Sequence, residues 1–499
     1  MRLVLGVFAN VSHLNLISLL GIAVMIAMAV LMSSDRRNIN WRLVGTGLVL
    51  QLLLAAVFFN SQRWTFPQSF SSFQSLANAV DQEDIDSSLV DVRALMDGKY
   101  ESFDTLREAI EDDTVAIEAF DSAIDEGLKV PRFPNGIVFH WIESFFRVIN
   151  RSVEAGTGFV FETHPSPDET PGTHPRAILT TFAFGVLPTV IFFAALMSVL
   201  YYLGIMQVLI RGMAWVMQKT LGVSGAEALA AAANVLVGHT EAPLVVKPYV
   251  ATMTRSELNA LMVGGFATIS GSLMAIFASI GVSAGHLLTA SIISAPAALV
   301  LAKILQPETE TPTDVKSVEA AMEQNAANVL QAAANGASEG MKLAINIAAM
   351  LIAFLALIMF IDILLQGIGG WVGLDLSLQR IFGIVFWPLA WIMGIEGKDC
   401  MVAGDLLGKK MVINEFVAYL DMIGGGFEPL SERSKVILTY ALCGFSNFGA
   451  IGIQLGGIGP LAPNRRSDLA QLGLRAMFGG MLACCMTGCV AGALFGIAR

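Results

Sequence analysis

The residues from 234 to 243 hold the side chains of this chain that are best placed to do chemistry. They read Asn-Val-Leu-Val-Gly-His-Thr-Glu-Ala-Pro, so an amide, an imidazole, a hydroxyl and a carboxylate stand beside a glycine and a proline that interrupt the backbone. Ionisable groups at membrane depth are costly and mark functional sites. Irregular backbone survives there only where it lines a cavity or packs within protein. The alternative interpretation is an ordinary cytosolic loop between two spans.

The composition makes a membrane the expected setting. Of the 499 residues, 55% are apolar and 14% are charged, and the mean hydropathy is +0.65. Long apolar runs in such a chain predict an all-α polytopic membrane protein. The five cysteines lie in apolar stretches without metal-ligand spacing, so we expect them to pack in the interior. The sequence has no Walker A motif, so nothing points to ATP as the energy source.

Two apolar runs near the N-terminus, residues 14–32 and 43–59, are predicted spans. The first run is too long for a signal-peptide core and lacks a cleavage-site pattern. Three arginines lie in the linker at 33–42, which places this linker in the cytoplasm by the positive-inside rule. The residues after the second run are therefore expected on the outer side.

The stretch from 62 to 174 is the least membrane-like part of the chain. Residues 81–130 carry sixteen Asp or Glu against four Lys or Arg, which accounts for the net charge of −11. Apolar residues at helical spacing within 90–124 predict one or two amphipathic surface helices. We interpret the acidic groups as a solvated external face rather than a cation site. The aromatic segment at 136–160 predicts an interfacial helix.

The rest of the chain alternates apolar runs with polar or mixed segments. A mixed segment at 210–221 suits a helix at the membrane interface. Residues 306–324 read as a polar loop, residues 325–339 as an aqueous or interfacial helix, and the run at 381–395 is apolar but short. Full spans are predicted at 177–203, 258–280, 286–304, 343–365, 436–455 and 472–497.

Two parts of the chain repeat one pattern. An Arg-Ser pair, a helical stretch and then Gly-Phe occur at 255–266 and again at 433–445, and each is preceded by an interrupted apolar segment that contains a glutamate. The arginines are 178 residues apart, the Gly-Phe pairs 179 and the glutamates 174. Transporters are commonly built from such repeats, and their substrate and ion sites lie where paired discontinuous helices meet near the midplane.

The repeat predicts a binding site that both halves build. Carboxylates accept hydrogen bonds from OH and NH groups, and amides and imidazole both donate and accept, so a neutral, hydroxyl-rich solute is expected. The Phe445 ring could cover a flat ligand. Carbonyls near Asn234 and Val237 could hold sodium together with the Thr268 hydroxyl. The polar site residues are Asn234, His239, Thr240, Glu241 and Thr268 in the first half and Asn414, Glu415 and Asn447 in the second.

Five motifs between about residue 182 and the C-terminus carry a family resemblance. They are Gly-His-Thr-Glu-Ala-Pro at 238–243, Met-Thr-Arg-Ser-Glu-Leu at 253–258, Gly-Gly-Phe-Ala-Thr-Ile at 264–269, Asn-Glu-Phe-Val-Ala-Tyr at 414–419 and Ala-Leu-Cys-Gly-Phe-Ser-Asn at 441–447. In this order and at this spacing they resemble the concentrative nucleoside transporter family in its bacterial form. The two N-terminal spans are compatible with that resemblance.

The resemblance implies a fold and a mechanism. The fold has eight transmembrane helices, interfacial helices, two re-entrant hairpins at 224–246 and 398–422, an inverted repeat, and separate scaffold and transport domains. The mechanism is an elevator-type alternating-access movement by which a homotrimer in the bacterial inner membrane imports nucleosides. Sodium is the coupling ion, and nucleoside and lipid bilayer are the other partners. We expect no enzyme activity, no cofactor and no nucleic-acid partner.

The chain then divides into six segments. Residues 1–60 hold the first two scaffold helices, and residues 61–176 the external acidic insert and the interfacial helix. The third span, the first hairpin and the following spans occupy 177–306. The remaining segments are the polar loop and helix at 307–342, the scaffold span and interfacial segment at 343–396, and the second hairpin with the last two spans at 397–499.

The resemblance also assigns roles to single residues. The substrate-binding set is Gly238, His239, Thr240, Glu241, Leu273, Glu415, Phe445, Asn447 and Ala450. The first four fall on the nucleobase side, Glu415 and Asn447 fall on the ribose, and Phe445 packs beside the base. The sodium set is Asn234, Val237, Thr268 and Ile269.

Two positions depart from the family pattern. The family usually has glutamine where this chain has His239, and its ribose-side serine maps to Ala450. Imidazole can hydrogen-bond to a base, but it has a different reach and one tautomer-dependent donor. These changes therefore bear on base preference and sugar selectivity, whereas all the sodium positions are retained.

Other interpretations stay open from the residues alone. A proton-coupled symporter could use His239 beside Glu241 as its titratable pair. An intramembrane hydrolase using that pair would need more metal ligands, such as a His-Glu-x-x-His pattern, which the sequence lacks. A channel fits paired broken helices and a repeat less well than alternating access does. Arg255 and Arg433 are predicted to be cytoplasmic anchors at helix starts rather than substrate ligands.

Overall fold

The structure is a computed structural model that describes residues 12–61, 67–69, 129–131, 137–161, 187–239, 241–312, 326–372, 376–424 and 429–496. The chain forms two compact units. The larger unit comprises residues 1–56 and 145–497, and the smaller comprises residues 57–144 with 498–499. Thr240 and the surface helices predicted within 90–124 lie outside the described residues.

The smaller unit contains a pair of short strands, β1 (Pro67–Ser69) and β2 (Lys129–Pro131). They pair antiparallel, with Pro67 opposite Pro131. The chain segment that contains the acidic residues of 81–130 therefore begins and ends near this pair of strands. Every regular element in the described part of the larger unit is helical, which confirms the predicted all-α membrane fold.

The first described elements of the larger unit are α2 (His13–Leu31), the 3-10 turn η1 (Arg36–Asn38) and α3 (Trp41–Ser61). The two helices match the first two predicted spans. Asp35 holds the turn between them, because it accepts hydrogen bonds from the Asn38 side chain at 2.6 Å and the Arg37 N–H at 3.1 Å. These two hydrogen bonds lower the pKa of Asp35 below its ordinary value.

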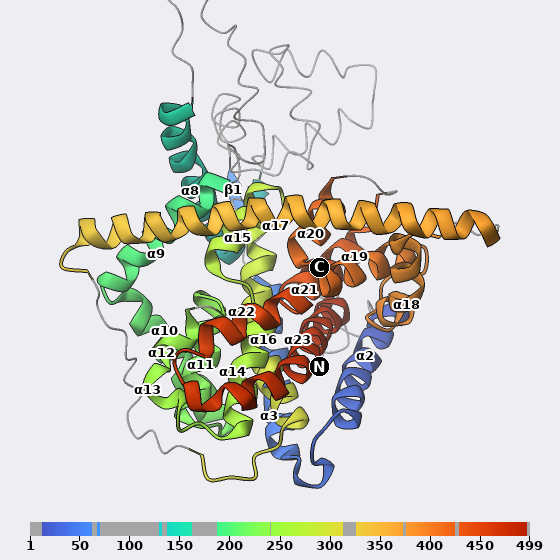
Figure 1. Cartoon of the computed structure of the whole chain (residues 1–499), viewed down its shortest axis with the longest axis horizontal. Helices are drawn as coiled ribbons and strands as arrows, with labels where there is room; N and C mark the ends of the chain where they lie inside the picture. The colour runs from blue at the N-terminus through green and yellow to red at the C-terminus, as the bar shows by residue number, and fades with distance from the viewer. Residues whose placement is uncertain are drawn as a thin grey trace, which may run out of the picture. The chain divides into compact units, whose positions relative to one another are not determined.

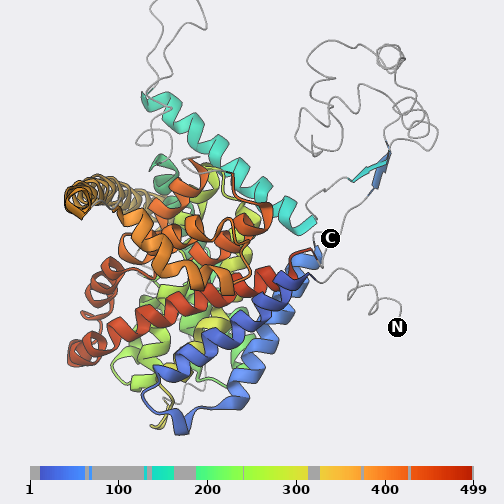
Figure 2. The ribbon, with the colours of Figure 1, turned by 90° about the vertical axis from the view of Figure 1, so that its right-hand side faces the viewer.

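Four described helices are long and apolar enough to cross a bilayer: α2, α3, α16 (Ala284–Leu305), and α23 (Arg466–Leu494) with the short turn η4 (Pro463–Arg465) before it. A fifth span results if α9 (Leu187–Tyr202) and α10 (Ile205–Leu221), which meet at a 78° bend, are counted as one. In α16 and α23, 89% of the apolar window is buried, against 33% in α2 and α3, so α16 and α23 form the centre of the unit. Figure 2 shows α2 lying alongside α23. The total of eight spans stays a prediction.

A single helix of 44 residues, α17 (Val329–Val372), runs across the view of Figure 1. It joins the helix predicted at 325–339 to the span predicted at 343–365 without a break. Two glycines let it pack closely on α9: a Cβ at Gly336 would lie 2.5 Å from a carbonyl oxygen of α9, and a Cβ at Gly340 would lie 2.7 Å from a Cα atom of α9. The two helices therefore touch backbone to backbone.

Two further helices match predicted short segments. They are α8 (Ile137–Phe161), at the predicted interfacial helix, and α18 (Leu378–Ile392), at the short apolar run. Phe146 of α8 stacks on Phe193 of α9 with ring centroids 6.2 Å apart. This aromatic contact packs the part of α8 that follows residue 144 on α9, within the larger unit.

Each half of the repeat folds into an interrupted hairpin, an interrupted helix and one continuous helix. The first half is α11 (Gly225–Leu236), α12 (Ala242–Val245), α13 (Lys247–Val250), α14 (Arg255–Ala267), α15 (Gly271–Ser279) and α16. The second half is α19 (Cys400–Val412), α20 (Glu415–Ile423), α21 (Glu432–Leu442), α22 (Phe448–Ile458) and α23. The same order of breaks in both halves supports the repeat inferred from the sequence.

Two runs that the sequence predicts as continuous spans, at 258–280 and 436–455, are each broken into two helices, and that prediction was wrong. The breaks separate α14 from α15 and α21 from α22. Each second helix starts on its own N-cap: Ser270 accepts a first-turn N–H of α15 at 3.4 Å, and Asn447 accepts one of α22 at 2.8 Å. Side-chain caps thus restart the helix inside an apolar run.

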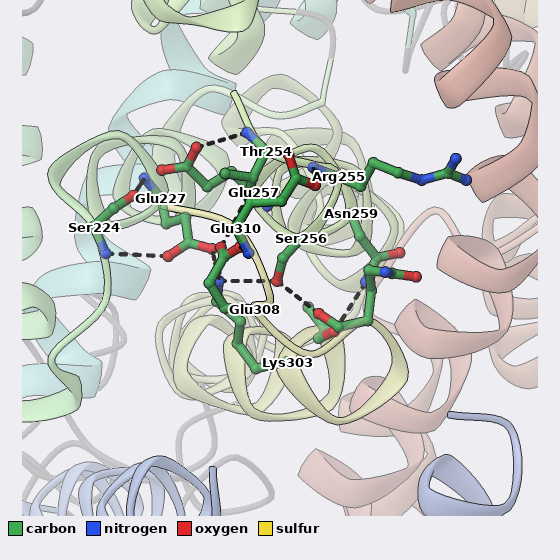
Figure 3. A network of polar contacts seen from close by, with 12 residues as sticks. Ser224, Glu227, Thr254, Arg255, Ser256, Glu257, Asn259, Lys303, Glu308 and Glu310 are labelled. Carbon is green, nitrogen blue, oxygen red and sulfur yellow. Dashed lines mark hydrogen bonds and ion pairs between the residues drawn. The ribbon is translucent and has the colours of Figure 1, made fainter. Parts of the chain in front are cut away.

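A buried polar cluster joins the start of α11 and the start of α14 to the end of α16 (Figure 3). Lys303 of α16 forms an ion pair with Glu227 of α11. Its Nζ also lies 3.2 Å from Glu308 and donates to the Ser256 hydroxyl at 3.0 Å. Glu227 in turn accepts the Ser224 N–H at 3.1 Å. The charge of the lysine is therefore compensated inside the protein, and the first hairpin is fixed to its own half.

Arg433, at the start of α21, holds the second half in another way. The guanidinium donates to the carbonyls of Gly394 at 2.8 Å and Gly492 at 2.9 Å, and to the Ser18 hydroxyl at 3.1 Å. It is only 6% exposed, so this helix-start residue, predicted as a cytoplasmic anchor, is a buried link between α2, α21 and α23. Its repeat partner Arg255 is 41% exposed and pairs with an aspartate of α23 at 3.3 Å, as a surface residue does.

Candidate functional site

The first hairpin turns at Gly238, between α11 and α12. Gly238 has a φ of +93°, and a Cβ there would lie 2.5 Å from the Ser270 Cβ. Both the conformation and the space exclude a side chain, so the turn can press against the break between α14 and α15. Of the predicted site residues that follow His239, Thr240 lies outside the described residues, and Glu241 stands at the N-cap position of α12 without a side-chain cap hydrogen bond.

Four predicted sodium residues gather where this turn meets that break. Asn234, Val237, Thr268 and Ile269 are all buried. Asn234 and Thr268 both meet α14 at Gly264: the asparagine Nδ2 lies 2.8 Å from the place of the missing Cβ, and the threonine hydroxyl donates to the carbonyl at 3.0 Å. The structure thus brings together one amide, one hydroxyl and the backbone at two breaks.

The amide of Asn234 is only half satisfied. Its Nδ2 donates to the Leu261 carbonyl at 3.5 Å, while its Oδ1 has no hydrogen-bond partner among the residues that the structure describes. A buried acceptor without a partner is costly. Uncharged oxygen ligands suit a hard cation, so this position could hold a small alkali ion.

The second hairpin presents a buried carboxylate. Asn414 caps α20 by accepting the Val417 N–H at 2.9 Å, which leaves Glu415 as the first residue of that helix. Glu415 is buried and accepts a hydrogen bond from the Asn447 Nδ2 at 3.3 Å. The other end of the same amide, Asn447 Oδ1, accepts the Ala450 N–H. The break between α21 and α22 therefore orients a carboxylate and an amide together, as the sequence predicts.

The two halves meet at an aromatic contact. The imidazole of His239 and the ring of Phe445 have centroids 4.2 Å apart and planes at 59°. His239 comes from the first hairpin and Phe445 from the break in the second half, so this contact closes the site. Neither ring nitrogen of His239 has a hydrogen-bond partner within the described part of the chain.

The remaining predicted residues lie at different depths. Leu273 on α15 and Ala450 on α22 are buried. Glu241 is exposed and interacts electrostatically with Tyr201 of α9 and Glu339 of α17. The structure therefore places Glu241 toward α9 and α17.

Two polar residues that the sequence reading left out are buried beside these groups. Lys410 lies in the last turn of α19, is 0% exposed, and donates to the Ala441 carbonyl at 2.7 Å. Gln454 lies in α22, is 2% exposed, and donates to the Met262 carbonyl at 3.1 Å. The signal for both was present, because a polar side chain inside an apolar run is a functional candidate at membrane depth.

Family profiles match most of the chain. The profile described as "Na+ dependent nucleoside transporter N-terminus" matches residues 20–82, "Nucleoside recognition" matches residues 183–284, and "Na+ dependent nucleoside transporter C-terminus" matches residues 286–492. An uncharacterised transporter of Haemophilus influenzae is 48% identical over 349 residues, which is 68% of this chain and 82% of that protein. This chain belongs to the concentrative nucleoside transporter family.

Other members of the concentrative nucleoside transporter family extend the comparison. The mouse sodium/nucleoside cotransporter 1 is 42% identical over 387 residues, 74% of this chain but 58% of the mouse protein. The structure of CNTnw in an inward-facing substrate-bound state superposes with a TM-score of 0.75 at 35% identity, over 97% of this chain and 98% of that one. The chain is therefore a multi-pass membrane transporter and not an enzyme, as predicted.

Proposed function

We propose that this protein is a sodium-coupled nucleoside symporter of the bacterial inner membrane. The observation that carries the proposal is the meeting of the two halves. His239 packs on Phe445, and two residues further along the chain Asn447 pairs with Glu415. One end of the site is thus flat and aromatic, and the other presents a carboxylate and an amide. A nucleoside has the matching pair of ends, a planar base and a ribose with hydroxyl groups.

Glu415 and Asn447 bind the ribose in this proposal. A carboxylate accepts hydrogen bonds from two hydroxyl groups, and an amide can donate and accept. Asn447 Oδ1 accepts the N–H that caps α22. Its Nδ2 is therefore the group that turns from Glu415 toward the sugar. Ala450 offers no hydroxyl, so the sugar contacts of this protein rest on these two side chains.

The base lies beside the contact of His239 with Phe445. Stacking of a base on the phenylalanine ring and hydrogen bonds to the free imidazole nitrogens would satisfy groups that lack partners among the described residues. Gly238, Thr240, Glu241 and Leu273 complete this end as the family resemblance assigns them. Glu241 reaches the base when the hairpin turns inward from α9 and α17.

Sodium binds at the break of the first half. The ligands are Asn234 Oδ1, the Thr268 hydroxyl, and the carbonyls of Val237 and Ile269. Support comes from the unpartnered Oδ1 and from the shared contact of Asn234 and Thr268 with Gly264. The ion bridges the hairpin and the broken helix, so its binding would stabilise the geometry that the nucleoside needs. That bridge is the physical basis of coupling.

An elevator-type movement carries the site across the membrane. The moving body contains the two hairpins with α14 to α16 and α21 to α23, and the scaffold contains α2, α3, α9, α17 and α18. Three scaffolds join in a homotrimer. Support for this division is the long α17, whose large apolar side chains are exposed at both ends, at Leu330 (82%) and Trp371 (90%).

Uptake of radiolabelled uridine and adenosine into proteoliposomes tests the proposal. The comparison is an inward sodium gradient against choline at fixed pH. We expect sodium-dependent uptake, and a fall in uptake efficiency of about 10–100-fold in Glu415→Gln, since a charge-assisted hydrogen bond contributes about 1.5–3 kcal/mol. Glu432→Gln is the matched control, because that glutamate is 68% exposed.

Three outcomes would overturn parts of the proposal. Uptake that ignores sodium and follows a pH gradient would replace sodium coupling by proton coupling. Equal uptake in Glu415→Gln and Glu432→Gln would remove the carboxylate from the sugar site. No uptake of either nucleoside by folded protein would reject nucleosides as the substrates.

A further inference from the structure

Gln454 is a polar residue in an apolar run of α22, Gly-Ile-Gln-Leu-Gly, that the function above leaves unused. Its side chain is 2% exposed. Nε2 donates to the Met262 carbonyl at 3.1 Å. Because that carbonyl can only accept, it fixes the orientation of the amide, with the nitrogen toward α14 and the oxygen away from it.

The oxygen of the Gln454 amide takes no part in the hydrogen bond to Met262. Gln454 Oε1 is buried and has no hydrogen-bond partner among the residues described. A buried acceptor that is unpaired destabilises the fold, so a polar residue at such a place needs a reason. The donor that completes the amide has to come from a bound molecule or an ordered water.

Gln454 lies next to the base end of the proposed site. Both Gln454 and His239 press on Gly265 of α14: a Cβ there would lie 2.7 Å from Gln454 Nε2 and 2.8 Å from the His239 Cβ. The His239 ring also contacts Phe445. Gln454 and His239 are therefore neighbours on one side of Gly265, beside an aromatic ring, and between them they carry three polar atoms without described partners: Gln454 Oε1 and the two imidazole nitrogens.

We propose that Gln454 is a specificity-determining residue that reads the edge of the nucleobase. Its Oε1 accepts a hydrogen bond from an N–H group of the base, while the neighbouring imidazole of His239 serves the adjacent position. The inference rests on the proposed function, since it names how that site chooses its substrate. It commits the ligand to bases with an N–H on the edge away from the sugar, as in uracil and hypoxanthine.

The glycines explain why the amide can reach this place. Gly264 and Gly265 leave room on adjacent sides of α14: the first admits the amide of Asn234 and the second admits Gln454 and His239. A step of one residue along the helix, or about 100° of rotation, thus separates an ion position from a base position. A side chain at residue 265 would displace both Gln454 and His239, the two residues proposed to contact the edge of the base.

The test compares two substrates that differ only in the N–H. Uridine carries it at N3, and 3-methyluridine does not. In the unaltered protein we expect uridine uptake to exceed 3-methyluridine uptake clearly. In Gln454→Met, which keeps the length and loses the acceptor, we expect that ratio to fall about 10-fold, the effect of one buried hydrogen bond. Inosine and 1-methylinosine repeat the comparison for a purine.

A matched control separates selectivity from packing. Ile458→Val changes the buried face of the same helix α22 without touching a polar group, and we expect its substrate ratio to stay at the value of the unaltered protein. Gln454→Glu keeps an acceptor and should keep most of the ratio. If Gln454→Met does not fold, the same ratio is measured with Gln454→Leu and by the melting shift that each nucleoside produces in detergent.

The possible results are distinct. An unchanged ratio in folded Gln454→Met would overturn the inference and leave the amide to a water molecule. An equal fall of the ratio in Ile458→Val would assign the effect to packing and overturn it as well. Failure of the unaltered protein to take up or bind any nucleoside would reject the proposed function itself, which is a different observation from an unchanged ratio.

Discussion

The two halves of the repeat place a nitrogen at corresponding points and use it in opposite ways. In the first half, Asn234 in the last turns of α11 donates to the Leu261 carbonyl of α14. In the second half, Lys410 in the last turn of α19 donates to the Ala441 carbonyl of α21. The amide keeps an acceptor for another partner, whereas the ammonium has three donors and no acceptor.

This difference teaches how a symmetric fold can respond to a single ion. The first half lacks a positive charge at that point and leaves an oxygen that a cation from solution can satisfy. The second half carries its cation covalently, and the Lys410 charge acts on Glu415 nearby. In the proposed function, sodium would then act on one half only, whereas Lys410 would stay beside Glu415, the carboxylate proposed to bind the sugar, whether or not sodium is bound.

The largest expected effect on stability concerns Arg433, whose partner in the repeat is Arg255. Replacing Arg433 by Met would remove three hydrogen bonds from a charged donor, to the carbonyls of Gly394 and Gly492 and to the Ser18 hydroxyl. At about 1.5–3 kcal/mol for each such hydrogen bond, we expect the free energy of unfolding to fall by at least about 3 kcal/mol. The melting temperature in detergent measures this.

The repeat partner provides the control for that prediction. Arg255→Met removes an exposed pair, which is worth about 0–1 kcal/mol, so its melting temperature should stay close to that of the unaltered protein. Equal losses of melting temperature in the two variants would mean that both arginines stabilise their halves to the same extent. That result would contradict the difference between the two halves.

The contrast between Arg433 and Arg255 also shows how much of the fold could be predicted from the sequence. Charge in a linker and apolar length locate α2 and α3, whereas the bounds of the two hairpins came from the family resemblance. Hydropathy does not record where a helix breaks, so the caps at Ser270 and Asn447 looked like small polar residues inside one span. For the same reason the less apolar start of α17 looked like a separate helix. The positive-inside rule counts arginines along the chain and cannot tell that Arg433 turns inward.

The site shows the same division. The family resemblance was enough to assign Glu415 and Asn447 to one side of the predicted site and His239 and Phe445 to the other, because each belongs to a recognisable motif. Lys410 and Gln454 were left out although a polar side chain in an apolar run already marks a candidate. The sequence could not give their partners, because the carbonyls that their nitrogens meet lie 31 and 192 residues away in the chain.

Asn234→Leu tests the half that takes its cation from solution. The variant keeps the volume and removes the oxygen, so we expect the sodium concentration for half-maximal uptake to rise at least about 10-fold, in line with the loss of one ion ligand. Sodium titration of uridine uptake measures it. Asn259→Leu is the control, since Asn259 is equally buried and donates to the Ala302 carbonyl of α16. A similar sodium shift in both variants would count against a site at Asn234.

Lys410→Met tests the half that carries its own cation, and we expect the smaller effect. The KM for uridine should rise about 10-fold, because Glu415 loses a compensating charge worth about 1.5 kcal/mol, while the sodium dependence stays nearly unchanged. Uridine titration at saturating sodium measures the first and sodium titration the second. Lys398→Met, at a lysine that is 67% exposed, should change neither. A sodium shift in Lys410→Met without a change in KM would reverse the assignment of the two halves.

The length of α17 has a consequence for how the protein meets the bilayer. A helix of 44 residues at a rise of about 1.5 Å per residue is about 66 Å long, whereas the hydrocarbon core is about 30 Å thick. An upright α17 would stand far out of the membrane and expose its apolar residues to water. Because large apolar side chains are exposed from Met341 to Trp371, over a length of about 46 Å, this part of the helix has to lean by about 50° to keep them in lipid. A helix that is tilted this far occupies a larger area of the membrane plane than an upright span does.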